Sequence, residues 1–244
     1  MFGQLTPITR NIIILNVVVF AFAYFIPLLD VILPAYYPFS PNFKSWQIVT
    51  HMFMHGGLMH ILFNMLTLAS FGPVLEQYLK EKRYLILYFA SGLGAFVLFN
   101  LWNFYEVQTL VSSLKSMGVD PSIIYEQSAI GYHGSNANPG TTPESRELAQ
   151  QLYNALRIPM VGASGAIFGV VAAFSTLFPD AKLMFMFIPF PIKAKYLFPI
   201  IIVVSVYLGF SGSMSGIAHF AHVGGALVGF ILAKVWNKNK FRIQ

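Results

Sequence analysis

The chain alternates between long apolar segments and shorter polar ones, and this pattern predicts its fold class. A membrane-spanning helix needs about twenty mostly apolar residues, and six segments meet that length. They run approximately over 11–33, 57–77, 84–103, 159–179, 195–212 and 219–236. Residues Pro199–Phe210, with the sequence PIIIVVSVYLGF, lack the two-residue alternation of a membrane β-strand. We therefore predict an all-α membrane protein, with six transmembrane helices in a single domain over 1–244.

Composition agrees with a membrane protein. Hydrophobic residues make up 56% of the chain and charged residues 10%, whereas soluble domains carry about 25% charged residues. The net charge of +6 does not indicate nucleic-acid binding, because the basic residues lie between apolar segments rather than in one patch. The chain has no cysteine, which excludes disulfides and thiol chemistry. The first apolar run is too long for a signal peptide, so we expect it to remain in the mature protein.

The basic residues are divided unevenly between the two sides of a six-span topology. One side holds Arg10, Lys80, Lys82, Arg83, Lys182, Lys193, Lys195, Lys234, Lys238, Lys240 and Arg242. The other side holds Lys44, Lys115, Arg146 and Arg157. Loops rich in Lys and Arg stay in the cytoplasm, so we predict an N-in/C-in topology. Residues 104–158 then form an insertion on the outside.

Several segments between the predicted helices have their own signals. Within the insertion, the polar residues Ser128–Asn138 predict a disordered loop. A helix is predicted after it from the start signal Thr142-Pro143-Glu144 and the apolar stripe Leu148, Leu152 and Leu156. Residues 34–56 and 181–193 are apolar but too short to span, so we place them in the membrane interface. The small residues of 209–218 suit a movable cap before the sixth helix.

Polar side chains inside a bilayer are costly, so each is a candidate for function. Ser164 lies among small residues in Gly162-Ala-Ser-Gly-Ala-Ile-Phe-Gly169. A nucleophilic serine needs room for a carbonyl carbon and a free backbone N–H for the developing oxyanion. Taken alone, this segment is more typical of a glycine-rich helix contact, in which the serine bonds back to its own helix.

Histidine and asparagine side chains could complete a site around Ser164. His222 in the sixth helix could accept the serine proton as a neutral imidazole. His60 and Asn64 are four residues apart and share one helix face, so both could donate to an oxyanion together with the Ser164 N–H. Each also has a structural alternative as an interhelical hydrogen bond. Because no carboxylate lies inside the bundle, the arrangement would be a Ser–His dyad rather than a triad.

Two glycine pairs predict how the fourth and sixth helices pack. Gly165 and Gly169 lie beside Ser164, and Gly225 and Gly229 share a face with His222. Small residues let helices approach closely in membranes. We therefore expect the two glycine stripes to meet and to bring the serine and the histidine together.

The combined motifs resemble the rhomboid family of intramembrane serine proteases of the bacterial six-helix type. The resemblance rests on the segments Trp46–His55, Leu58–Met65, Gly162–Gly169 and Ala221–Gly229. It implies cleavage of transmembrane segments of other membrane proteins, without a cofactor, at a site that opens to the outside of a bacterial cytoplasmic membrane. The expected partners are membrane-protein substrates and the lipid bilayer. The oligomeric state is left open.

The resemblance also assigns roles to individual residues. It makes Ser164 the nucleophile, His222 the base, and His60 and Asn64 oxyanion donors. It implies that His51 and His55 are a structural pair and that Glu76 holds the loop after the second helix. The spacing of His51 and His55 would also fit zinc, but no third ligand is evident, so we predict no metal site. Phe168 stands where the family commonly has a tyrosine stacked on the base, so the stacking remains and the hydroxyl is lost.

Two other classes of protein are consistent with a polytopic helical chain. A catalytically silent relative that binds membrane proteins would lack Ser164 or His222, and both are present. A transporter would favour charged residues at mid-membrane and broken helices in paired halves, and the sequence shows neither.

Overall fold

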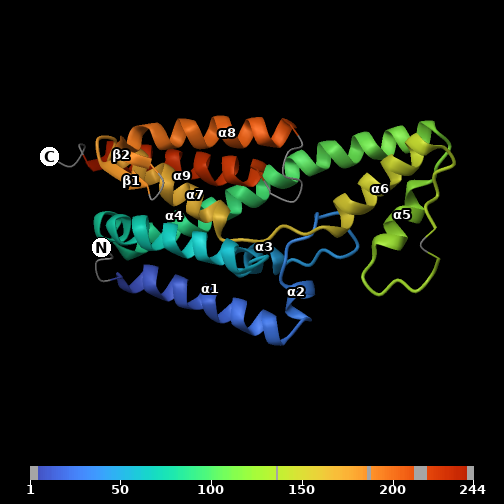
Figure 1. Ribbon diagram of the computed structural model, residues 1–244, viewed down its shortest axis with the longest axis horizontal. Coiled ribbons are helices and arrows are strands. Elements are labelled where there is room, and N and C mark those ends of the chain that lie inside the picture. Colours follow the sequence, from blue (N-terminus) through green and yellow to red (C-terminus); the bar gives the residue numbers. More distant parts are fainter. Residues whose placement is uncertain (1–4, 136, 186–187, 212–218, 241–244) are drawn as a thin grey trace.

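The protein is an elongated helical bundle with a smaller helical lobe at one end (Figure 1). This computed structural model describes residues 5–135, 137–185, 188–211 and 219–240. Its helices are α1 Pro7–Phe25, α2 Leu29–Ile32, α3 Gln47–Thr50, α4 Leu58–Ser116, α5 Pro121–Ser128, α6 Pro143–Arg157, α7 Ser164–Leu177, α8 Leu197–Ser211 and α9 His219–Lys240. Two 3-10 turns, His51–Phe53 and Ala194–Tyr196, and the strands β1 Lys182–Phe185 and β2 Ile188–Lys193 complete the described elements.

The centre of the bundle is formed by α4, α7 and α9, which make the most extensive contacts with one another. Lys80, with φ 68° and ψ 162°, divides α4 into two helices that run in opposite directions. The core contains fully buried side chains such as Leu68, Tyr88 and Val170. α1 packs outside the first half of α4, and α8 packs on α9 (Figure 1). α1 begins and α9 ends at the same end of the bundle, opposite to the lobe.

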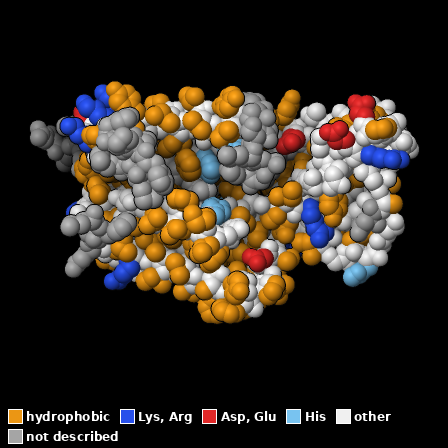
Figure 2. Space-filling view, viewed as in Figure 1, with side chains coloured by type: hydrophobic (Ala, Val, Ile, Leu, Met, Phe, Trp, Pro, Cys, Tyr) orange, Lys and Arg blue, Asp and Glu red, His pale blue; other side chains and the backbone are white. Residues whose placement is uncertain are grey.

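The outer surface of the bundle is apolar, as a lipid-facing surface requires. Large exposed side chains include Phe22, Val203 and Tyr207, and apolar side chains are spread over the coloured part of the bundle in Figure 2. Three described helices are long and apolar enough to cross a membrane: α1, α4 with its two antiparallel halves, and residues 219–237 of α9. α7 and α8 are shorter apolar helices.

Two regions correct the predicted elements. The helix expected over 84–103 continues to Ser116, and its extension packs with α5 and α6 around a separate core. That core consists of Tyr37, Val107, Leu110, Leu114, Val119, Ile124, Ala149, Leu152 and Leu156. Residues 181–193, expected only as an interfacial segment, form an antiparallel hairpin that pairs Lys182 with Lys193. The described chain is nevertheless mostly helical, which is consistent with the predicted all-α membrane fold.

The polar loop of the lobe is also more structured than expected. The Gln127 side-chain amide donates to the carbonyl oxygens of Ser135 and Ala137, both at 3.0 Å. Asn138 donates to the carbonyl of Arg146 at 2.9 Å. These bonds hold the loop against α5 and α6, so the prediction of disorder over Ser128–Asn138 is wrong for its described residues.

Glu76 supports the fold at a different place from the one predicted. Its carboxylate accepts hydrogen bonds from the backbone N–H groups of Ile8 at 3.0 Å and Thr9 at 2.8 Å, and from the hydroxyl groups of Thr6 and Thr9. These N–H groups lie in the first turn of α1, where they have no helical partner and where the helix dipole favours an anion. Glu76 thus anchors the start of α1 to α4, rather than holding the loop that follows α4's first half.

Candidate active site

Ser164 is the first residue of α7, at the end of an extended segment. Ala35 and Met160 exchange backbone hydrogen bonds of 3.0 and 2.8 Å, and the Gly162 N–H donates to the His51 carbonyl at 2.9 Å. These bonds keep residues 159–162 out of the helix, although the sequence predicts a helix from 159. Gly162 has a φ of 124°, which favours glycine. Because Ser164 starts the helix, its N–H has no intrahelical acceptor.

The side chains of Ser164 and His222 meet between α7 and α9. The Ser164 hydroxyl lies 3.0 Å from His222 Nε2, within hydrogen-bond distance. A neutral imidazole that accepts at Nε2 carries its proton on Nδ1, so we assign that tautomer. The ring of Phe168, one turn after Ser164, stacks on His222 with centroids 4.0 Å apart and planes inclined by 10°. This stacking fixes the plane of the imidazole without a hydroxyl.

The two glycine pairs explain how α7 and α9 come this close. A Cβ built on Gly225 would lie 1.9 Å from the Gly165 carbonyl oxygen, and one on Gly229 would lie 2.1 Å from that of Gly169. Real Cβ atoms essentially never approach another atom closer than 3.0 Å. The helix backbones are therefore in direct contact one residue after Ser164 and three residues after His222. Figure 2 shows histidine side chains near the middle of the face, among apolar side chains.

His60 and Asn64 supply polar donors on the first half of α4. The Gly56 N–H approaches His60 Nδ1 at 3.4 Å, which leaves the ring proton on Nε2. A Cβ built on Gly162 would lie 3.0 Å from His60 Nε2 and 3.4 Å from the Ser164 hydroxyl, so both atoms border the same small space. The amide nitrogen of Asn64 is buried and has no hydrogen-bond partner among the residues that the structure describes. A buried donor without a partner is unusual, and it is suited to a hydrogen-bond acceptor on a bound substrate.

His51 and His55 lie beside this space rather than in it. Nδ1 of His51 lies 2.8 Å from the Gln47 carbonyl, and the side chain is buried. The ring of His55 meets that of His60 edge-to-face, with centroids 5.1 Å apart. Burial lowers the pKa of both His51 and His55 to about 4, and His60 adds to the effect on His55. Over the described residues, no group of three potential metal-ligating side chains gathers here.

Comparison with known protein families decides the classification. The model of the rhomboid domain matches residues 42–118 and 131–238, which includes Ser164, His222, His60 and Asn64. The chain belongs to the rhomboid family. Its two matched segments include all of α4 and α7 and residues 219–238 of α9.

Curated relatives of this rhomboid include named proteases and rhomboid-like proteins. Rhomboid protease AarA of Providencia stuartii is 26% identical over 81% of the chain and 58% of its own length. Rhomboid protease GluP of Bacillus subtilis is 24% identical over 77% of the chain and 25% of its length. RHOMBOID-like protein 4 of Arabidopsis thaliana is 26% identical over 79% of the chain and 34% of its length. The matched part thus spans between a quarter and three-fifths of these relatives.

Two further features lie beside the dyad: His219, which is also a polar candidate from the sequence, and a contact between α4 and α9. His219, one turn before His222, is buried, and within the described part of the chain its Nε2 has no hydrogen-bond partner. Its ring is perpendicular to that of His222, with centroids 6.3 Å apart. Gly94 of α4 meets Gly224 of α9, since a Cβ on Gly224 would lie 2.4 Å from the Gly94 carbonyl oxygen. The neighbouring glycines of α9 thus face two helices: Gly224 lies against α4 and Gly225 lies against α7. The cap expected over 209–218 lies largely outside the described residues.

Proposed function

We propose that this rhomboid is an intramembrane serine endopeptidase that cleaves transmembrane segments of other membrane proteins. The observation that carries the proposal is the 3.0 Å contact between the Ser164 hydroxyl and His222 Nε2. A serine within hydrogen-bond reach of an oriented imidazole is the arrangement that activates a hydroxyl nucleophile. The matches to named rhomboid proteases support the same reading.

The reaction follows from the positions of these atoms. Ser164 Oγ attacks the carbonyl carbon of the scissile bond while its proton passes to His222 Nε2. The developing oxyanion accepts hydrogen bonds from the Ser164 N–H, His60 Nε2 and Asn64 Nδ2. His222 then gives the proton to the leaving amine, which leaves an acyl ester on Ser164. Water, deprotonated by His222, hydrolyses that ester, so no cofactor is required.

We propose a topology of six spans with both termini in the cytoplasm from the distribution of Lys and Arg, and this topology sets the depth of the site. α7 has 14 residues, a length of about 21 Å, against a bilayer core of about 30 Å. If the end of α7 at Leu177 reaches the cytoplasmic boundary, Ser164 lies about 9 Å below the outer boundary. Residues 159–162, which are not helical, connect this site to the lobe. This topology places the site toward the outside of a bacterial cytoplasmic membrane.

The test is cleavage of a reporter transmembrane segment by the purified protein in lipid vesicles. Ser164→Ala and His222→Ala should each abolish cleavage, and the double variant should lose no more, because the pair works as a unit. Ser175→Ala is the matched control, since Ser175 is buried in the same helix and its hydroxyl donates only to the Val171 carbonyl. Retained cleavage in either dyad variant would refute the assignment. Binding without cleavage by the wild type would favour a silent membrane-protein binder.

A further inference from the structure

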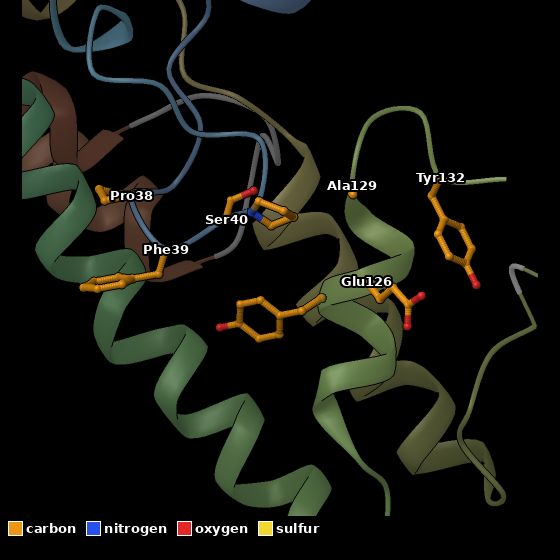
Figure 3. Close-up of a pocket in the computed structure, with 8 residues that line it drawn as sticks. Pro38, Phe39, Ser40, Glu126, Ala129 and Tyr132 are labelled. Carbon is orange, nitrogen blue, oxygen red and sulfur yellow. The ribbon is translucent and has the colours of Figure 1, made fainter. Parts of the chain in front are cut away.

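A groove lies on the lobe, between the loop that follows α2 and helix α5 (Figure 3). It has a volume of about 440 Å³ and is open to the surface. Its lining residues are Pro38, Phe39, Ser40, Pro41, Tyr125, Glu126, Ala129 and Tyr132. None of these residues belongs to the dyad or to the oxyanion donors.

The chemistry of the groove suits an apolar side chain with a cation beside it. Its walls are mostly aromatic rings and prolines, and the Phe39 side chain is 65% exposed. Aromatic faces attract cations as well as apolar groups. Glu126 is exposed at the same groove and forms no ion pair with any residue in the part of the chain that the structure describes. In Figure 3 the Glu126 side chain is directed toward Tyr132, so the groove offers one carboxylate without an ion pair to any described residue, on the Tyr132 side of α5.

The charge of the whole lobe favours a basic partner. Residues 104–158 contain five acidic and three basic residues, whereas the chain as a whole has a net charge of +6. Two of the three basic side chains bond to backbone carbonyls within the lobe. Arg157 donates to Ser128 at 3.3 Å and Ala129 at 3.2 Å, and Arg146 donates to Gly140 at 3.0 Å. With five acidic and three basic residues, the lobe carries a formal net charge of −2, against +6 for the whole chain.

Both walls of the groove are bonded to the segment that leads to the nucleophile. The Ser40 hydroxyl donates to the Leu156 carbonyl at 2.6 Å. Asn42 joins the loop to the end of α5 by two hydrogen bonds. Its side-chain amide donates to the Ser128 carbonyl at 2.9 Å and accepts from the Ile130 N–H at 2.7 Å. Leu156 lies eight residues before Ser164. These bonds therefore fix the two walls of the groove relative to each other and to the segment before Ser164.

The separation of the groove from the dyad can be worked from α4. The first turn of α7 lies against Ala95, because a Cβ on Gly165 would lie 2.4 Å from the Ala95 Cβ. At the groove, the rings of Phe39 and Phe104 have centroids 6.0 Å apart. Nine residues of helix between Ala95 and Phe104 correspond to about 14 Å. An extended chain covers that distance in about four residues.

We propose that this groove binds the extramembrane segment of the substrate, through an aromatic or aliphatic side chain next to a Lys or Arg. In the substrate, these two side chains lie about four to six residues from the scissile bond, on the part of the chain outside the membrane. The spacing rests on the proposed function, because it counts from a bond held at Ser164. The groove then selects substrates by sequence outside the membrane, before the transmembrane segment reaches the dyad.

The experiment measures binding separately from cleavage, on the Ser164→Ala variant in detergent micelles. Fluorescently labelled reporters carry one transmembrane segment and a Phe-Lys pair placed two, five or nine residues outside the bond that the wild type cleaves. If the wild type cleaves none of the reporters, the position of the Phe-Lys pair is counted from the outer end of the reporter's apolar segment. Fluorescence anisotropy should show the tightest binding with the pair at five residues. Phe39→Ala should weaken binding of that reporter about tenfold.

Charge reversal gives the sharpest comparison. Glu126→Lys should weaken binding of the Phe-Lys reporter about tenfold at low salt, and a Phe-Glu reporter should recover it. Glu147→Lys is the matched control, since Glu147 is an exposed acidic residue of α6 away from the groove, and it should leave both affinities unchanged. Equal effects of the two reversals, or affinity independent of the position of the pair, would overturn the groove proposal. Position-dependent binding without cleavage by the wild type would instead overturn the protease assignment and leave the groove supported.

Discussion

Adding one methyl group at Gly225 should separate the catalytic pair. The built Cβ lies 1.9 Å from the Gly165 carbonyl oxygen and needs at least 3.0 Å, so α7 and α9 must move apart there by about 1 Å in the Gly225→Ala variant. The Ser164–His222 contact, now 3.0 Å, would lengthen toward 4 Å, beyond hydrogen-bond distance. A misplacement of about 1 Å can cost roughly 10²-fold in rate. We expect kcat to fall by at least that factor.

Stability should change much less than activity. Replacing glycine by alanine in a helix gains about 1 kcal/mol of helix propensity, which offsets part of the lost packing. Turnover of a reporter and the thermal unfolding midpoint should be measured on the same preparations. Leu227→Ala, on the exposed side of α9, is the control that removes side-chain volume without touching α7. Near-normal kcat in Gly225→Ala, or loss of activity only through unfolding, would refute this account of the site.

Three further changes test other parts of the structure. Asn64→Ala should lower kcat about 10²-fold with little change in KM, as measured by steady-state kinetics, because one oxyanion donor is lost; a defect confined to KM would contradict this role. Glu76→Gln should lower the unfolding midpoint without changing KM, because a neutral amide weakens the anchoring of α1; an unchanged midpoint would contradict that role. Burial lowers the pKa of His51 to about 4, so its stabilising contribution is complete above about pH 6.5 and is lost as the pH falls toward 4. His51→Asn should flatten the fall in unfolding free energy over that range, and an unaltered slope would show that His51 is not responsible.

Much of the bundle could be predicted because its signals are local. Each of the six apolar segments contains a described helix, since length and apolarity suffice to indicate one. The helical period also predicts which side chains share a face, which is why the pairs Gly165–Gly169 and Gly225–Gly229 could be expected to meet. Membership of the rhomboid family, inferred from the spacing of four motifs, is confirmed by the family match.

The missed features depend on contacts between distant segments or on ambiguous local patterns. Glu76 lies 67 residues from Thr9, and nothing near either residue indicates their bond. The extension of α4 to Ser116 did carry a signal, because Val107, Leu110 and Leu114 recur at helical spacing within a polar stretch. The hairpin over 182–193 is an apolar run interrupted by prolines, and apolarity alone does not separate a strand from a helix. The extended residues before Ser164 are likewise set by Ala35 and His51 rather than by their own sequence.

The central claim is that His222 activates Ser164, and the rate at which a fluorophosphonate labels the protein tests it most directly. Attack by an activated serine forms a stable phosphonate ester that mass spectrometry assigns to one peptide. The account predicts a single adduct on Ser164 in the wild type and a rate at least about 10³-fold lower in His222→Ala. An adduct on another serine, or equal labelling rates in the two proteins, would contradict it.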